Sequence, residues 1–156
     1  MSIAVFDIDG VVADVRHRVH HIARRPKDWG RFFGAAAEDP GSDEGISWVL
    51  RAAQDHQIVW LTGRPEWLRR VTERWLIEQG LPVEELIMRG DLDHRPAALL
   101  KVAELRRLAA RDIVVFVDDD PEVIQTAADA GFTASLATWL PRGEILAEAQ
   151  DRAGRT

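Results

Sequence analysis

The stretch "VFDIDGVVAD" at residues 5–14 decides the fold, because an apolar run ends in two carboxylates one residue apart. Side chains alternate faces along a strand, so Asp7 and Asp9 share one side if the chain stays extended through Ile8. Like charges this close repel each other, and burying either one costs free energy. A bound cation, or a catalytic role for the acids, would explain the pair.

Outward from this stretch, strand-like segments alternate with helix-like segments. We predict strands at 2–7, 57–62, 85–89, 112–118 and 132–138, and helices at 26–39, 43–56, 64–80, 96–111, 121–131 and 141–152. Pro65 suits the first turn of its helix, and Gly80 suits the end. The unbroken apolar run "DIVVFVD" at 112–118 is typical of a central parallel strand covered on both faces.

This alternation predicts an α/β fold, a Rossmann-like three-layer sandwich with a mostly parallel five-stranded sheet. In such sheets ligands bind beyond the carboxyl ends of the strands. The strands predicted to end at Asp7, Thr62 and Asp118 should therefore bring their terminal residues to one crevice.

Length and composition are ordinary for one globular domain, which we expect to span residues 1–156. The chain has no Cys, which fits a reducing cytosol, and we expect no signal peptide, no membrane segment and a cytoplasmic location. A net charge of −6 argues against strong attraction of the whole surface to nucleic acid. A local basic segment, Arg16 to Lys27, is a solvated helix face or a rim for phosphates, and the oligomeric state stays open.

The polar residues at the strand ends suggest phosphoryl chemistry. Asp118, Asp119 and Asp120 add three acids to Asp7 and Asp9, and such an oxygen-only cluster suits Mg²⁺. An aspartate can attack phosphorus, and a second carboxylic acid can move the proton. Thr62, the amide of Gly63 and Lys101 could supply the donors and charge that a transferred phosphoryl group needs. Each piece alone also suits a turn, a helix cap or a solvated surface, so their joint order carries the argument.

The motifs "DIDGV", "LTGRPE", Lys101 and "VFVDDDPE" resemble the four motifs of the haloacid dehalogenase superfamily of phosphohydrolases. The resemblance implies Asp7 as nucleophile and Asp9 as general acid/base, with an aspartyl-phosphate intermediate. It implies that Thr62 and Lys101 bind the phosphoryl group. It implies that Mg²⁺ is held by Asp7, the backbone carbonyl of Asp9 and an acid of the last motif, with Asp119 preferred as direct ligand and Asp118 as its support. Val11 stands where many members have Thr.

A narrower likeness concerns "GRPE" and "DHRPAALLK", with Asp93, Arg95 and Lys101 spaced D-x-R-x5-K. These stretches look like the 3′-phosphatase domain of phage polynucleotide kinase, although this chain has no kinase P-loop. The likeness implies that four residues help to bind a nucleic-acid end: Arg18, Arg64, Asp93 and Arg95.

Residues 14–42 leave room for a small helical flap or lid in place of a large cap, so we expect an open site. The expected function is a Mg²⁺-dependent phosphomonoesterase acting on the 3′-phosphate of nucleic-acid ends. Two alternatives stay open: a phosphatase of free nucleotides or other small phosphomonoesters, and a phosphate-binding module without catalysis.

Overall fold

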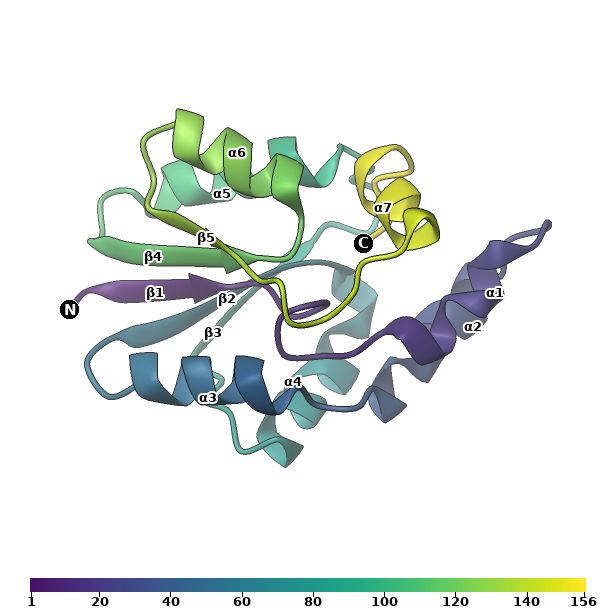
Figure 1. The fold of residues 1–156 in the computed structure, drawn as a ribbon, viewed down its shortest axis with the longest axis horizontal. Coiled ribbons are helices and arrows are strands. Elements are labelled where there is room, and N and C mark those ends of the chain that lie inside the picture. The colour runs from purple at the N-terminus through teal and green to yellow at the C-terminus, as the bar shows by residue number, and fades with distance from the viewer.

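The computed structural model describes all 156 residues and contains one five-stranded sheet, shown in Figure 1. The strands are β1 (Ile3–Phe6), β2 (Gln57–Pro65), β3 (Glu85–Arg89), β4 (Ile113–Asp118) and β5 (Ala134–Leu136). Their order is β3-β2-β1-β4-β5, and every pairing is parallel. The predicted Rossmann-like α/β fold is therefore confirmed, with a sheet that is parallel throughout.

Helices cover both faces of the sheet, α3 (Asp43–Ala52) and α4 (Arg69–Glu78) on one side and α5 (Ala97–Leu108) and α6 (Pro121–Asp129) on the other (Figure 1). The alternation of side chains along β1 divides the core between these layers. Ala4 and Phe6 belong to the apolar cluster that contains Trp75 of α4. Ile3 and Val5 belong to the second cluster, which contains Leu105 and Val123. Since β1 is buried on both faces and paired on both edges, its carboxyl end is a fixed point in the fold.

The end of β2 differs from the sequence expectation. Pro65 does not begin a helix; it closes β2 in an extended conformation, with φ −67° and ψ 149°, and pairs with Arg89 of β3. A short 3₁₀ turn, η3 (Glu66–Leu68), then leads into α4. Proline fixes φ at a value that extended backbone also accepts, so the residue type alone does not choose between the two. Gly80, with φ +74°, follows the end of α4 as predicted.

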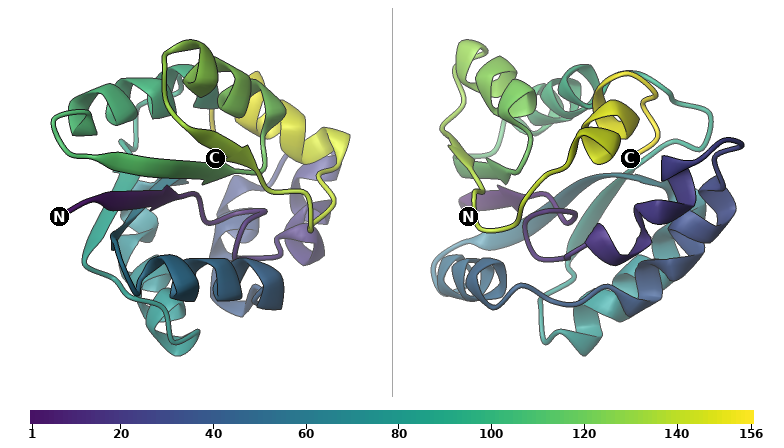
Figure 2. Two further views of the ribbon diagram at one scale, coloured as in Figure 1. Left: turned by 60° about the vertical axis from the view of Figure 1, so that its left-hand side comes forward. Right: turned by 45° about the vertical axis from the view of Figure 1, so that its right-hand side comes forward.

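Between β1 and α3 the chain forms four short helical turns, visible beside the sheet in Figure 2. They are η1 (Arg16–Arg18), α1 (His20–Ala23), α2 (Trp29–Gly34) and η2 (Ala35–Glu38). The basic segment divides here, because Arg16, Arg24 and Arg25 are exposed whereas Arg18 is fully buried. The Arg18 guanidinium lies 4.4 Å from the centre of the Phe32 ring.

After β5 the chain returns along the carboxyl end of the sheet through α7 (Glu144–Asp151) to residues 152–156, here called the tail. The C-terminus lies close to the carboxyl ends of the strands in both views of Figure 2. Arg142, just before α7, lies 3.0 Å from Asp120 and 3.1 Å from Asp151, which ties this segment to the end of β4. No helix of the protein has both the length and the apolar character needed to cross a bilayer.

Candidate active site

Three carboxylates meet where β1 and β4 end side by side. Asp7, Asp118 and Asp119 each place a carboxylate oxygen within 4.8 Å of the others, and all three side chains are buried. The backbone N–H of Ile8 donates to Asp7 Oδ1 over 2.8 Å, which fixes the orientation of that carboxylate. The acids predicted at the ends of two separate strands therefore form one cluster.

Lys101 is the cation in contact with this cluster. Its Nζ lies 2.6 Å from Asp118 Oδ2 and 2.9 Å from Asp7 Oδ2, and α5 carries it to a buried position. Burial raises the pKa of Asp7, and the opposing charge of Lys101 lowers it. The negative charges of Asp118 and Asp9 raise it further, so that the pKa of Asp7 is about 8. One ammonium group thus does not fully offset the buried acids.

The carboxylate of Asp119 has no hydrogen-bond donor or ion-pair partner. Neither of its carboxylate oxygens has a hydrogen-bond partner, although the side chain is buried. Burial raises its pKa well above the usual range, and the charges of Asp118 and Asp7 add to that effect. Gly10 allows the close approach, because a Cβ there would lie 2.0 Å from Asp119 Oδ2, and its φ of +78° disfavours other residues. Buried carboxylate oxygens without donors fit a hard divalent cation such as Mg²⁺.

Asp9 points into a different environment from Asp7. Its Oδ1 accepts hydrogen bonds from Arg64 Nε and Nη2 at 2.9 and 2.6 Å and a longer one from Arg18 at 3.4 Å. Burial alone would raise the pKa of Asp9, but the charges of Arg64 and Arg18 outweigh it and lower the pKa. The Asp9 side chain is not part of the three-carboxylate cluster. Asp7 therefore pairs with Lys101, whereas Asp9 pairs with arginines.

Asp39 completes this second environment, and the sequence analysis missed it. The Asp39 carboxylate accepts from Arg18 at 2.8 and 3.1 Å and from Arg64 at 2.8 Å, and His17 Nε2 lies 2.6 Å away. The carboxylate is fully buried, and the indole of Trp75 donates to its backbone carbonyl. Because "EDPG" is typical of a surface turn, no sequence pattern indicated a buried acid here.

Thr62 and Gly63 lie beside β1 near the end of β2, and both are buried. Thr62 Oγ1 accepts a 3.1 Å hydrogen bond from the backbone N–H of Arg64, two residues along the chain. Gly63 is packed so closely that a Cβ there would lie 2.2 Å from the backbone of Thr156. The structure brings these residues to the same edge as the acids without a direct contact between Thr62 and the cluster.

Asp93 and Arg95 lie apart from the cluster. They bond to each other, with Arg95 Nη2 2.7 Å from Asp93 Oδ2, and the Arg95 side chain is half exposed. The hydrogen bonds from Arg95 lower the pKa of Asp93 to about 2. This loop is held by Arg89, which the sequence analysis missed: its guanidinium donates to the carbonyls of Gly63, Asp93 and Arg95. Arg89 ends β3, so the rule applied to the other strand ends would have found it.

The tail closes the site, contrary to the expected open crevice. Asp7 and Asp9 are 2% and 3% exposed. The hydroxyl of Thr156 donates to Asp9 Oδ2 over 3.2 Å, and a Cβ on Gly154 would lie 2.0 Å from the carbonyl oxygen of His94. A segment distant in sequence therefore contacts Asp9 and helps to bury it.

Solved structures with the same fold include several phosphatases. The assemblies described as the Pnkp1/Rnl/Hen1 complex and the Pnkp1/Rnl/Hen1 RNA repair complex match at TM-scores of 0.69 and 0.73, with 18% and 19% identity. Each covers 90% of this chain, which spans 47% and 43% of theirs. A class C acid phosphatase from Bacillus anthracis with tungstate bound matches at 0.61, with 18% identity over 83% of this chain and 61% of that chain.

A HAD family enzyme from Bacteroides thetaiotaomicron, in complex with magnesium and inorganic phosphate, matches at a TM-score of 0.56 with 10% identity, over 94% of this chain and 98% of that one. A search of curated proteins by sequence found no match. The parallel sheet with acids at the ends of β1 and β4, together with a family model that matches residues 1–135, identifies the chain as a phosphatase domain of the HAD class. Within that class the chain belongs to the family described as the polynucleotide kinase PNKP phosphatase domain, whose model matches residues 1–135.

Proposed function

We propose that the protein is a Mg²⁺-dependent phosphomonoesterase that removes 3′-phosphates from nucleic-acid ends through an aspartyl-phosphate. One observation supports the chemistry above all others: Asp7 lies beside Lys101 on one side and beside the partnerless carboxylate of Asp119 on the other. The family match supports the substrate class. Residues 14–42 serve as a small flap on one domain in this proposal.

In this proposal the two acids of the pair have different roles, and the family match supports that division. A carboxylate oxygen of Asp7 attacks phosphorus, a P–O bond forms, and the bond to the leaving alkoxide breaks. Asp9 acts in its protonated form, which substrate binding must favour because Arg64 and Arg18 lower the pKa of Asp9 in the free protein. Asp9 gives its proton to the alkoxide, then takes a proton from the water that attacks the aspartyl-phosphate and regenerates Asp7. Thr62, the Gly63 amide and Lys101 bind the phosphoryl oxygens through both steps.

The metal would be held by Asp7, the backbone carbonyl of Asp9 and the acids at the end of β4, Asp119 directly and Asp118 in support. When bound it would supply positive charge to the phosphoryl oxygens. Arg18 and Arg64 both donate to the carboxylate of Asp9 and therefore orient it. In this proposal their effect on the substrate is indirect and acts through the position of Asp9. In this proposal Asp93 and Arg95 contact the strand that carries the phosphate, and the side chain of Arg95 is half exposed.

The test is release of phosphate from a 3′-phosphorylated oligonucleotide with Mg²⁺, compared between the wild type, Asp7→Asn and the exposed control Asp129→Asn. We expect turnover in the wild type and the control, and a loss of at least about a thousandfold in Asp7→Asn, because an amide is a very weak nucleophile. Equal slow release by the wild type and Asp7→Asn would disprove the proposal. Activity should also fall as salt rises if several backbone phosphates are contacted.

A second candidate is a phosphatase of free nucleotides or other small phosphomonoesters. The burial of Asp7 and Asp9 under the tail favours it, because a small molecule enters a covered site more readily than a polymer. The ratio of kcat/KM for the oligonucleotide to kcat/KM for the matching 3′-mononucleotide separates the two. A ratio above one supports the polynucleotide substrate, and a ratio well below one supports the small substrate.

A further inference from the structure

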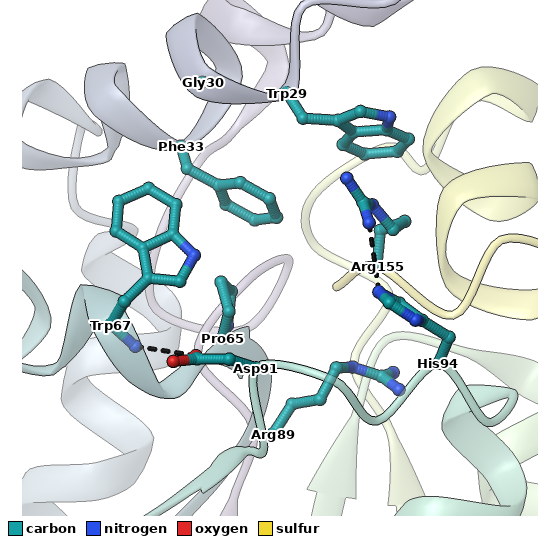
Figure 3. Close-up of a pocket in the computed structure, with 9 residues that line it drawn as sticks. All are labelled: Trp29, Gly30, Phe33, Pro65, Trp67, Arg89, Asp91, His94 and Arg155. Carbon is teal, nitrogen blue, oxygen red and sulfur yellow. Dashed lines mark hydrogen bonds between the residues drawn. The ribbon is translucent and has the colours of Figure 1, made fainter.

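A pocket lined by aromatic and basic side chains opens beside the covered acids. Figure 3 shows it between the flap, the end of β2, the loop after β3 and the tail. The side chains used below are Trp29 and Phe33 from α2, Pro65 from the end of β2, Trp67 from η3, and Arg155 from the tail. It encloses about 100 Å³, and nothing in the proposed chemistry uses it.

The aromatic rings in the pocket are held in fixed orientations. Trp29 stacks on Phe33, with ring centres 6.1 Å apart and planes at 26°, and Phe33 meets Trp67 edge-on at 5.7 Å. The Trp67 backbone N–H donates to Asp91 Oδ1 over 2.9 Å, which anchors the turn that carries the ring. Trp67 is 56% exposed, which is unusual for so large an apolar side chain in this protein. Large aromatic faces left accessible in a pocket favour a flat ligand.

Two chain connections link this pocket to the acids. Pro65 directly follows Arg64, whose guanidinium bonds to Asp9. Arg155 directly precedes Thr156, whose hydroxyl bonds to the same carboxylate. On each of these two segments, a residue that lines the pocket is therefore adjacent in sequence to a residue that bonds to Asp9.

Two residues of the tail, Arg155 and Thr156, occupy the space between this pocket and Asp9. The flat guanidinium of Arg155 lies 4.8 Å from the centre of the Trp29 ring, while the next residue presents an oxygen to Asp9. A planar group on the indole and a polar oxygen at the acids, joined by a short flexible link, is also the layout of one nucleotide. Arg155 and Thr156 thus mark where a base and its phosphate-bearing sugar would lie.

We propose that this pocket binds the base of the terminal nucleotide whose phosphate is removed. The base stacks on Trp29 in place of Arg155, with Phe33 and Trp67 forming the adjoining wall. Stacking on an aromatic ring is tolerant of base identity, since every base has a π-face. The inference rests on the proposed function, because it takes the terminal phosphate to lie at Asp7.

Binding rather than turnover tests the inference. In the full chain carrying Asp7→Asn, with Mg²⁺, fluorescence anisotropy gives the Kd of a 5′-labelled, 3′-phosphorylated oligonucleotide and of the same strand with an abasic terminal nucleotide. We expect the base to tighten binding roughly 5- to 150-fold, the range of one base–aromatic stack. Trp29→Ala and Trp67→Ala should reduce that ratio toward one, whereas Trp29→Phe and the exposed control Leu92→Ala should preserve it.

Each outcome decides the matter. A ratio near one in the parent chain, or a ratio that survives both alanine variants, overturns the inference. Trp29 is partly buried, so if Trp29→Ala unfolds, the exposed Trp67→Ala decides alone. Failure of the proposed function has a different signature: the chain with Asp7 intact releases no phosphate from the base-bearing strand. A base-dependent ratio that disappears in Trp67→Ala supports the pocket in that case too.

Discussion

Asp119 is the residue whose surroundings demand a ligand most clearly. A buried carboxylate without a donor costs several kcal/mol unless it is protonated or bound to a cation. The neighbouring Lys101 contacts Asp7 and Asp118 instead, so no cation is in direct contact with Asp119, and the nearby acids and burial outweigh the more distant cations. The side chain is thus unfavourable for the fold by itself and favourable for a metal.

We therefore predict opposite effects of Asp119→Asn with and without metal. Without Mg²⁺ the variant should be more stable than the wild type by about 1 kcal/mol or more, because one like charge is removed. With saturating Mg²⁺ the wild type should gain stability and the variant should not. Thermal unfolding with and without EDTA measures both, and exposed Asp129→Asn is the control. A wild type whose unfolding temperature ignores Mg²⁺ would contradict the prediction.

Single residues of the site could be predicted where they belong to a sequence motif or follow the end of a predicted strand. Asp7, Asp118 and Asp119 gather as expected, because the carboxyl ends of parallel neighbours meet at one edge. Asp93 and Arg95 have the predicted spacing but bond to each other at the rim, since spacing along the chain does not fix direction in space. Asp39 lay outside any pattern, because its partners Arg18 and Arg64 come from distant segments.

At the scale of elements, Asp39 joins the flap to the sheet. It accepts hydrogen bonds from Arg18 at the end of η1 and from Arg64 in β2, and both guanidinium groups also reach Asp9. Two carboxylates, Asp39 and Asp9, therefore share two buried guanidinium groups that belong to different elements. The orientation of Asp9 depends on a link that spans the flap and the sheet.

Replacing Asp39 should destabilise the whole fold. Asp39→Ala leaves two buried guanidinium groups short of a counter-charge, and breaking such pairs costs about 3–5 kcal/mol. Urea denaturation measures the free energy of unfolding, with the exposed neighbour Glu38→Ala as matched control. If Asp39→Ala lowers the free energy of unfolding by less than about 1 kcal/mol, the prediction is wrong, and water rather than Asp39 can solvate the two arginines.

Element types were largely predictable, whereas element ends were not. The order of strands and helices follows from apolar runs and periodicity, and all five predicted strands form. β2 continues to Pro65 because β3 offers a partner at Arg89, which is a tertiary effect. Local sequence cannot report a pairing made with another strand.

At the scale of the whole molecule, the tail and the flap jointly cover the site. The stretch "RAGRT" at 152–156 has no periodicity, so its return to Asp9 could not be predicted from local sequence. The tail lies beyond the residues that the family model matches, 1–135. Its contacts, Thr156 on Asp9 and Arg155 on Trp29, fall where substrate is proposed to bind.

Removing residues 152–156 should therefore improve access to the acids. We expect KM for a small phosphomonoester to fall roughly tenfold or more, the value of one hydrogen bond to a charged group. Steady-state kinetics with Mg²⁺ measure it, and Arg152→Ala, which is exposed and outside these contacts, is the control. An unchanged or higher KM would indicate that the tail supports binding instead of competing with it.

The central place of β1 has a consequence for how the protein moves. Hydrogen-bonded to strands on both edges and covered on both faces, Ile3–Phe6 opens to solvent only when the whole domain unfolds. Motions that admit a ligand are then confined to the peripheral segments, and Asp7, which directly follows β1, keeps its position. If Asp7 is the nucleophile, as proposed, little entropy is lost in aligning it for attack.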